Sequence, residues 1–333
     1  MNCQDKYGRS VEYLRVSVTD RCNLRCVYCM PPEGVPWKQR DAILSLEQVA
    51  KIVEAAAGLG FRKVRLTGGE PLVRKGIVDL VAGIASTPGI EEVSMTTNAV
   101  LLGHFAEDLA AAGLARVNIS LDTLNPDRFR RITRLGDIDR VWRGIEAAER
   151  AGLTPLKINM VVVRGLNDDE LADFARLTYN YAWHIRFIEV MPVGNGLDWG
   201  LDMPAAGQRF MSVAEMQQQL AHLGRLAPVD GPRGNGPARY FRLPEARGTI
   251  GFISPLSQHF CATCNRLRLT ADGRLRPCLF SDRGVHAKPL MDAGADVTEL
   301  QALIRQVVDI KPYERPLPAT APVADVAMSM IGG

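Results

Sequence analysis

The chain has 333 residues, enough for a large buried core, and we expect one large domain and a smaller one. Apolar residues make up 47% of it and charged residues 23%, which is typical of soluble globular proteins, and no apolar run reaches the roughly 18 residues of a membrane span. The net charge of +3 argues against a dedicated nucleic-acid binder, which usually carries a strong basic stripe.

The first two-thirds of the chain alternates between strand and helix periodicity. Strands are expected at 11–18, 63–67, 92–97, 116–121, 156–163 and 184–191, and helices at 46–58, 77–84, 101–112, 126–133, 138–151, 169–181 and 212–223. Ser45 is the expected N-cap of the first helix. This order predicts an α/β fold with a parallel sheet, and six such units predict an incomplete (β/α)6 TIM-type barrel. A doubly wound sheet would alternate similarly and stays an alternative.

A Gly- and Pro-rich stretch at 228–238 is a linker by composition. It separates an expected barrel domain, residues 1–227, from an expected C-terminal domain, residues 239–333. In the second part we expect short strands at 239–243, 248–253 and 265–270, followed by helices at 284–292 and 297–309.

Three cysteines, Cys22, Cys26 and Cys29, follow the first expected strand in the pattern C-x3-C-x2-C. Cysteine thiolates hold iron–sulfur clusters, and a closed [4Fe–4S] site takes four of them. Three thiolates leave one iron without a protein ligand, and a small chelating molecule can bind at that open position. A structural zinc site is the alternative, but it needs a fourth Cys or His close by, and the first histidine after this group is His104.

Polar residues stand where the expected strands end, which in barrel enzymes is the side on which the reaction takes place. These stretches are Thr67-Gly68-Gly69-Glu70-Pro71, Thr96-Thr97-Asn98, Ser120-Leu121-Asp122 and Glu189-Val190-Met191-Pro192. The glycines allow the backbone to approach a ligand closely. The cysteine spacing, the aromatic Tyr28 and the Gly-Gly-Glu stretch together resemble the radical S-adenosylmethionine (SAM) superfamily. The resemblance implies that SAM chelates the open iron and that Gly-Gly-Glu-Pro lines its methionine end.

A second group, Cys261, Cys264 and Cys278, has the pattern C-x2-C-x13-C. His259 and His286 are close enough in sequence to complete a zinc site, so zinc stays an alternative here. The residues between these cysteines predict a hairpin that turns at Asp272-Gly273 and carries four arginines, Arg266, Arg268, Arg274 and Arg276. Guanidinium groups bind phosphate oxygens in pairs, so this hairpin indicates an anion receptor. The alternative is a solvated basic hairpin.

Residues 260–273 and 277–280, with 15–26 and the terminal Met330-Ile331-Gly332-Gly333, resemble the GTP 3′,8-cyclase family of molybdenum cofactor biosynthesis. The resemblance spans nearly the whole chain and implies a lyase with two [4Fe–4S] clusters. It implies that the first cluster reductively cleaves SAM to a 5′-deoxyadenosyl radical and that the second binds the guanine of GTP. The radical is expected to take the hydrogen from ribose C3′, after which the C3′ radical attacks C8. One-electron reduction then gives (8S)-3′,8-cyclo-7,8-dihydroguanosine 5′-triphosphate.

The resemblance also implies roles for individual residues. The metal ligands are Cys22, Cys26, Cys29, Cys261, Cys264 and Cys278, and the SAM-binding residues are Tyr28, Gly69, Ser120 and Met191. The GTP-binding residues are Arg15, Arg65, Thr96, Lys157, Arg266, Leu267 and Arg268, of which Arg266 and Arg268 are expected to be catalytic. Arg15, Arg65 and Lys157 lie inside expected strands, where a buried charge needs a counter-ion such as a triphosphate. Many relatives carry Gly at the position of Ala99, and Gly332-Gly333 is expected to enter the active site.

Six of the seven cysteines fall into these two groups, which suits metal ligation in a reducing cytosol, and residues 1–5 show no secretory signal, so we expect a cytoplasmic protein. Expected partners are GTP, SAM, a reductase or flavodoxin-type electron donor and cyclic pyranopterin monophosphate synthase, the next enzyme of the pathway. No nucleic acid or membrane is expected, and a homodimer is left open. Two other classes remain: a radical SAM enzyme acting on RNA or a peptide, and a non-enzymatic zinc protein.

Overall fold

The computed structural model describes residues 3–192, 199–200, 203–232, 236–281, 283–314 and 328. The terminal Gly332-Gly333, which the family resemblance predicts to enter the active site, lies outside these residues. Within them, no helix is both long enough and apolar enough to cross a membrane.

The strands, in chain order, are β1 Tyr13–Ser17, β2 Lys63–Thr67, β3 Glu92–Thr97, β4 Arg116–Ser120, β5 Lys157–Val162, β6 His184–Glu189, β7 Ala227–Val229, β8 Arg239–Arg242, β9 Thr249–Ile253, β10 Arg266–Leu269, β11 Arg274–Arg276 and β12 Val285–His286. The helices are α1 Leu46–Gly58, α2 Ile77–Ala85, α3 Ala106–Ala111, α4 Pro126–Thr133, α5 Ile138–Arg150, α6 Leu171–Asn180, α7 Val213–Leu220, α8 Lys288–Asp292 and α9 Val297–Asp309. Ser45 caps α1 as expected, in a capping box with Gln48.

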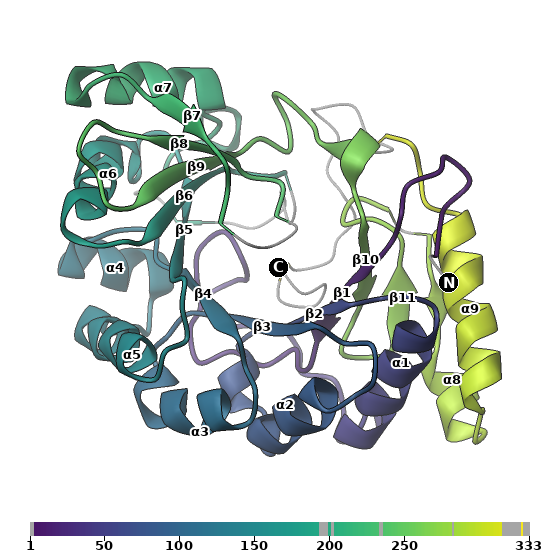
Figure 1. The fold of residues 1–333 in the computed structure, drawn as a ribbon. Helices are drawn as coiled ribbons and strands as arrows, with labels where there is room; N and C mark the ends of the chain where they lie inside the picture. The colour runs from purple at the N-terminus through teal and green to yellow at the C-terminus, as the bar shows by residue number, and fades with distance from the viewer. Residues whose placement is uncertain are drawn as a thin grey trace.

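In the described part of the chain, twelve strands form one sheet in the order β12-β11-β10-β1-β2-β3-β4-β5-β6-β9-β8-β7. Strands β1 to β6 are parallel and follow one another in sequence. The sheet curves around a central space, and α1 to α6 lie on its outer side (Figure 1). A doubly wound sheet would reverse its strand order part-way, and this one does not. The predicted α/β fold, an incomplete TIM-type barrel with six βα units, is therefore confirmed.

The C-terminal part of the chain extends both edges of the barrel. β10 pairs in parallel with β1, and β9 pairs in parallel with β6. Antiparallel strands then continue each edge, β11 and β12 beyond β10, and β8 and β7 beyond β9. Residues 239–333 thus share one sheet with residues 1–227, and the division into two domains stays a prediction.

Three stretches differ from the expected elements. The helix predicted over 101–112 is divided into a 3-10 turn, Leu102–His104, and the shorter α3. The helix predicted over 284–292 begins only at Lys288, because Val285 and His286 pair with β11 as β12, and Pro289 fits only the first turn of a helix. The expected linker, 228–238, contains the end of β7, which pairs with β8 although its three residues carry no alternating pattern.

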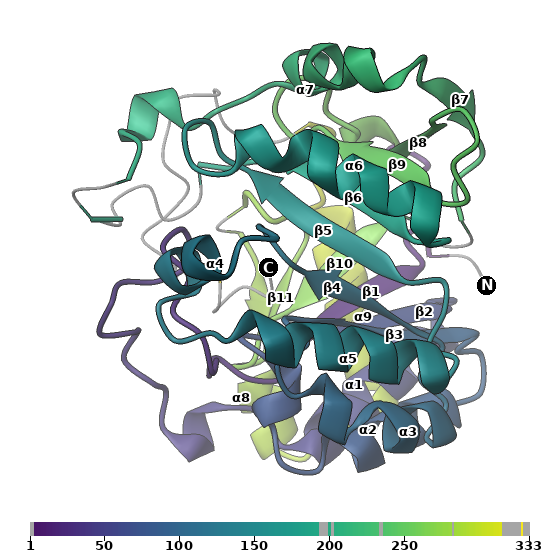
Figure 2. The same cartoon turned by 90° about the vertical axis from the view of Figure 1, so that its left-hand side faces the viewer.

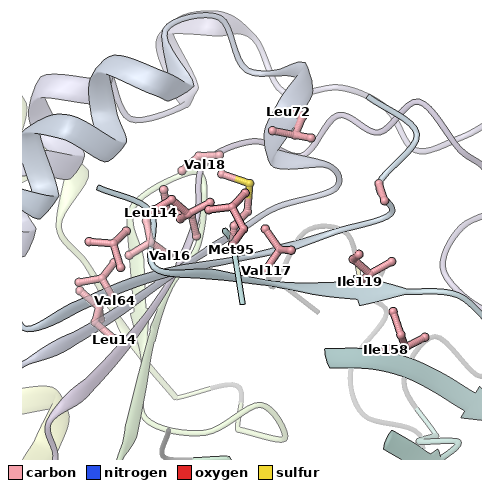
Figure 3. Packing of buried hydrophobic residues seen from close by; sticks show 14 of the residues in the cluster. Leu14, Val16, Val18, Val64, Leu72, Met95, Leu114, Val117, Ile119 and Ile158 are labelled. Atoms are coloured by element: carbon pink, nitrogen blue, oxygen red, sulfur yellow. The ribbon is translucent and has the colours of Figure 1, made fainter. Parts of the chain in front are cut away.

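The parallel strands alternate between an outer apolar face and an inner polar face. Apolar side chains of β1 to β5, among them Val16, Met95 and Val117, gather along the strands toward the outer helices (Figure 3). Because successive residues of a strand point to opposite faces, Arg15 and Arg65 point the other way from Val16 and Val64. The packing of the outer face thus fixes which polar side chains enter the barrel.

Candidate functional site

A cavity of about 910 Å³ lies inside the barrel and contacts both cysteine groups. Its lining includes most of the residues singled out in the sequence, namely Arg15, Cys22, Cys26, Tyr28, Cys29, Arg65, Gly69, Thr96, Ser120, Met191, Cys261, Cys264, Arg266, Arg268 and Cys278. Two expected residues, Lys157 and Leu267, are not part of this lining. The fold thus brings segments from both ends of the chain to one internal space.

The loop with the first cysteine group is held against α4. The amide of Val27 donates to the carbonyl of Ile132 at 2.9 Å, and the amide of Arg25 donates to that of Thr133 at 2.9 Å. Arg134 donates to the carbonyls of Arg25 and Met30, each at 3.0 Å. This loop, which follows β1, and α4 lie on the same side of the barrel (Figure 2).

The two glycines after β2 have a packing role that the sequence did not reveal. A Cβ atom on Gly69 would lie 2.3 Å from the carbonyl oxygen of Arg21, and one on Gly68 would lie 2.7 Å from that of Thr19. The amide of Gly69 also donates to Thr19 O at 2.8 Å. The glycines therefore let the backbone of the cysteine loop pass close to β2, in addition to leaving Gly69 open to the cavity.

Glu70 connects the ends of β2 and β3. Its carboxylate accepts hydrogen bonds from Thr97 Oγ1 at 2.7 Å and from the amide of Asn98 at 2.8 Å. Asn98 Nδ2 in turn donates to Asn23 Oδ1 at 2.8 Å, in the cysteine loop. Burial raises the pKa of Glu70 to about 7, although these hydrogen bonds favour the charged form. Glu70 thus fixes the neighbourhood of Cys22 through Asn98 and Asn23.

The Tyr28 side chain is held by Asp122, which follows β4. Tyr28 Oη donates to Asp122 Oδ2 at 2.5 Å, while Asp122 Oδ1 accepts from the amide of Val161 at 2.8 Å. Burial raises the pKa of Asp122 to about 6, and the hydrogen bonds from Tyr28 and Val161 act against this rise. The aromatic ring before the third cysteine is therefore fixed at the wall of the cavity beside Trp199, whose ring centre is 6.3 Å away.

A row of arginines crosses the inner face of three neighbouring strands. The register pairs Arg15 of β1 with Arg268 of β10 on one side and with Arg65 of β2 on the other. Burial, followed by the charge of Arg268, lowers the pKa of Arg15 well below its usual range. Burial lowers the pKa of Arg65 and of Arg268 to about 10. Like charges packed this closely favour an anion in the space in front of them.

In comparison with known proteins, two family models match consecutive parts of the chain. The radical SAM superfamily matches residues 16–178, and the family described as Molybdenum Cofactor Synthesis C matches residues 183–316. A GTP 3′,8-cyclase of Moorella thermoacetica is 51% identical over 330 residues, which cover 99% of this chain and 100% of that protein. One of Heliobacterium modesticaldum is 53% identical over 311 residues, 93% of each chain. The chain belongs to the GTP 3′,8-cyclase family.

A solved structure supports the fold. The crystal structure of Streptococcus suis SuiB bound to S-adenosylmethionine matches with a TM-score of 0.59 at 16% identity, covering 90% of this chain and 69% of that one. Membership of the GTP 3′,8-cyclase family confirms the expected cofactor classes, SAM and iron–sulfur clusters.

The donor set of this GTP 3′,8-cyclase family member fits two clusters with one open iron each. All seven cysteines are free thiols, and two sets of three line the same cavity. Among the residues that the structure describes, no three His, Cys, Asp or Glu side chains converge closely enough for a single ion. The three sulfurs of a cluster site bind three different irons, so they do not need to converge on one point.

The two cysteine groups differ in their electrostatic surroundings. Burial, followed by the charge of Glu70, raises the pKa of Cys22 to about 12, and burial raises that of Cys26 well above its usual value. Burial acts in the same direction on Cys264, but Lys311 and Arg266 outweigh it and lower the pKa of this thiol. A bound metal deprotonates thiols of either kind, so the difference concerns the charge around each cluster.

The four arginines of the hairpin between Cys264 and Cys278 have different surroundings. Arg266 and Arg268 line the cavity, whereas Arg274 and Arg276 do not. Arg276 is only 3% exposed and donates to the carbonyls of Ser281 at 2.6 Å and Leu279 at 3.3 Å, so it holds the loop after Cys278. Only two of the four arginines of the expected receptor thus face the cavity. The burial of Arg268 and Arg276 shows that the solvated-hairpin alternative is wrong.

The cavity also contains a cation that the sequence reading missed. Arg186 of β6 lines the cavity, is 3% exposed and donates from Nη2 to Asn118 Oδ1 at 2.7 Å. Its signal in the sequence is an arginine between apolar residues of an expected strand. Arg15 and Arg65 share this pattern, but the resemblance to the family singled them out. Lys157 lies beside it, because the register pairs Asn118 with Lys157 and Asn159 with Arg186.

Proposed function

We propose that this chain is a lyase that converts GTP to (8S)-3′,8-cyclo-7,8-dihydroguanosine 5′-triphosphate in the barrel cavity. Cys22, Cys26 and Cys29 hold one [4Fe–4S] cluster, and Cys261, Cys264 and Cys278 hold the other. The observation that carries the proposal is that two sets of three free thiols and a row of arginines line the same cavity. Each set leaves one iron open, one for SAM and one for the substrate.

Residues near the first cysteine group bind SAM. Tyr28, Gly69, Ser120 and Met191 line the cavity and come from the cysteine loop and from the C-terminal ends of β2, β4 and β6. Bound at this cluster, SAM supplies a carbon radical that abstracts a hydrogen atom. The hydrogen bond from Tyr28 to Asp122 keeps the ring of Tyr28 in one orientation, so the tyrosine contributes a fixed wall to the SAM site.

The arginine row binds the substrate. Arg15, Arg65, Arg266 and Arg268 line the cavity together with Thr96, and they supply the positive charge that a triphosphate requires. Arg266 and Arg268 lie closest in sequence to the second cysteine group and contact the part of GTP held there. Leu267 is 0% exposed and belongs to the hydrophobic core, so it contributes through its main chain alone.

Lys157 contributes charge from behind the lining. It is 3% exposed, and burial together with the charges of Arg116, Arg186 and Arg65 lowers its pKa to about 6. In the substrate-free protein near neutral pH its amine is therefore largely uncharged. A bound triphosphate favours the ammonium form, so Lys157 takes up a proton when GTP binds.

The same proposal includes an electron donor and the enzyme that receives the product. Cleavage of SAM takes up one electron, and the nucleotide radical left after C3′ attacks C8 takes up a second electron and a proton. A reductase or flavodoxin-type donor is therefore required, and the product passes to cyclic pyranopterin monophosphate synthase. A cytoplasmic location suits both partners and the six thiols. A homodimer remains part of the prediction. The tail Gly332-Gly333 is proposed to reach the cavity.

The decisive experiment is anaerobic incubation of reconstituted protein with SAM, a reductant and GTP. We expect 5′-deoxyadenosine together with an isomer of GTP that carries a new carbon–carbon bond, and no cyclised nucleotide when ATP replaces GTP. Iron and sulfide should each reach about eight per chain, as two cubane clusters require. Zinc in place of iron would support the non-enzymatic class, and 5′-deoxyadenosine formed only with RNA or a peptide would support the other radical SAM class.

A further inference from the structure

Lys311 is a buried lysine at the second cysteine group. It follows α9, is 2% exposed and ranks among the largest fully buried side chains of the described residues. Its Nζ donates to Cys264 Sγ at 3.4 Å, to Arg266 O at 2.7 Å and to Pro277 O at 2.8 Å. An ammonium group has three hydrogens, and these three acceptors use all of them.

The chemical types of the three acceptors indicate where a charge that compensates the ammonium group can reside. None of them is a carboxylate: one is a thiol sulfur, and two are carbonyl oxygens. Burying a cation costs several kcal/mol unless negative charge lies nearby. Arg116, another buried cation, has such a partner in Glu92 at 2.5 Å. The Cys264 sulfur is therefore the contact of Lys311 at which a compensating charge can reside.

The carbonyls place Lys311 between both strands of the hairpin. Arg266 stands at the start of β10, next to Cys264, and Pro277 immediately precedes Cys278. One ammonium group thus connects the segments that carry two of the three expected ligands. A side chain that only filled space would not donate a hydrogen bond to each of these acceptors.

Arg9 holds the residue that follows Lys311. Its Nε pairs with Asp5 Oδ2 at 2.5 Å, and its guanidinium donates to Cys261 O at 2.7 Å and to Pro312 O at 2.8 Å. Arg9 therefore connects the residue after Lys311 to the third expected ligand. The two cations together reach all three segments of the second cysteine group.

We propose that Lys311 is a positioning residue for the second iron–sulfur cluster: its ammonium group fixes the Cys264 sulfur and the Pro277 carbonyl, and it places a positive charge against the cluster. The inference rests on the proposed ligands Cys261, Cys264 and Cys278. A positive charge beside a ligand sulfur stabilises the reduced cluster, which carries one more negative charge. Lys311 therefore raises the reduction potential of this cluster.

The test isolates the second cluster in a background in which Cys22, Cys26 and Cys29 are each replaced by Ala. In this background Lys311→Gln keeps donors of hydrogen bonds but removes the charge, and Lys311→Met removes both. Lys51→Met is the matched control, because Lys51 Nζ donates to the backbone carbonyl of Ala295 at 2.5 Å rather than to a cysteine sulfur. Each protein is reconstituted anaerobically, its iron and sulfide are measured, and its cluster is titrated by electron paramagnetic resonance.

We expect the background protein and Lys51→Met to bind about four irons per chain and to titrate at the same potential. Lys311→Gln should retain iron and titrate at a more negative potential. Lys311→Met should show at least as large a shift and should lose part of its iron. Full iron content and an unchanged potential in both Lys311 variants would overturn the role of Lys311 while leaving the ligand assignment intact. A background protein without iron would overturn both.

A second measurement covers the case in which the Lys311 variants do not fold. The background protein is labelled with 15N-lysine, its cluster is reduced, and the coupling of 15N to the cluster spin is measured by pulsed electron paramagnetic resonance. A lysine nitrogen in contact with a ligand sulfur should give a resolved 15N coupling. A reduced cluster without such a coupling would overturn the inference, whatever the variants do.

Discussion

Arg15 and Arg268 occupy the same register position on two adjacent parallel strands, β1 and β10, although they stand near opposite ends of the chain. Burial and the charge of Arg268 lower the pKa of Arg15, and burial and the charge of Arg266 lower that of Arg268. The barrel thus packs like charges together in the cavity before any substrate arrives. Such an arrangement costs stability in the empty protein and favours the binding of an anion.

Replacing Arg268 by Met should separate these two effects. We expect the free energy of unfolding of the empty protein to rise by about 1 kcal/mol or more, because a buried like charge is removed. GTP binding should weaken at least about tenfold, since a charge-assisted hydrogen bond contributes roughly 1.5–3 kcal/mol. Denaturant unfolding and equilibrium binding measure the two quantities.

Arg276→Met is the control from the same hairpin. Arg276 is buried but does not line the cavity, and it donates to the carbonyls of Ser281 and Leu279. This variant should lose about 1–3 kcal/mol of stability, because it leaves those carbonyls unsatisfied. A stabilised Arg276→Met, or an Arg268→Met that binds GTP normally, would contradict the assignment of the two arginines.

Arg266→Ala should weaken GTP binding or cyclisation at least about tenfold and leave the iron content unchanged. Lysine at this position should restore the activity only in part, because a point charge lacks the planar fork of the guanidinium group. Cleavage of SAM without GTP should continue, since it takes place at the other cluster. Normal GTP turnover by a protein with both Arg266→Ala and Arg268→Ala would rule out the contact.

Cys26→Ala should remove one cluster and abolish SAM cleavage while the second cluster persists. The ligands of the second cluster lie on a different segment, held by Arg9 and Lys311 rather than by the loop of the first group. We expect iron to fall to about four per chain. Loss of all iron would show that the two sites do not form independently.

GTP binding should take up a proton through Lys157. Burial lowers the pKa of this lysine to about 6, so between that value and the unfolded value of 10.5 the folded protein binds fewer protons than the unfolded chain. Its contribution to the free energy of unfolding therefore increases as the pH rises through this range. Calorimetry at pH 7.5 in buffers of different ionisation enthalpy should show proton uptake, and Lys157→Met should reduce it. Equal uptake in Lys157→Met would assign the proton to another group.

Ala99 offers a test of backbone strain. It has a φ of 62°, in the left-handed region that favours glycine. Ala99→Gly should change the free energy of unfolding by less than about 1 kcal/mol, because relief of strain offsets the added freedom of the unfolded chain. Ala56→Gly, at an equally buried site inside α1, should cost at least about 1 kcal/mol. Equal losses in the two variants would show that Ala99 is not strained.

Local patterns predicted most of the barrel. The bounds of β2, β3, α4 and α9 agree with the periodicity residue by residue, because each alternates cleanly and ends at a turn residue or a capping residue. β12 and β7 were missed, since strands this short depend on their partners and carry no periodicity of their own. Both cysteine groups were visible as spacings. Because β10 pairs in parallel with β1, Cys22, which follows β1, and Cys264, which precedes β10, lie toward opposite ends of the strands that line the cavity.

Other parts of the site depend on contacts between distant segments. Lys311 and Arg9 stand outside every motif, and only the folded chain brings them to the cysteines. The glycines after β2 were visible, but their close approach to Thr19 and Arg21 was not. A sequence pattern reports which residues share a face, and it cannot report which segment will pack against that face.

The pairing of β10 with β1 also determines when the sheet can be completed during synthesis of the polypeptide. β1 is made first, and the strand that covers one of its edges emerges only about 250 residues later, which at about 5–20 residues per second is roughly 10–50 seconds. During this interval β1 presents open backbone groups to any other chain nearby. The first cysteine group is complete early, whereas the second waits for the last part of the protein. Ribosome-bound intermediates of this chain should therefore acquire iron in two stages.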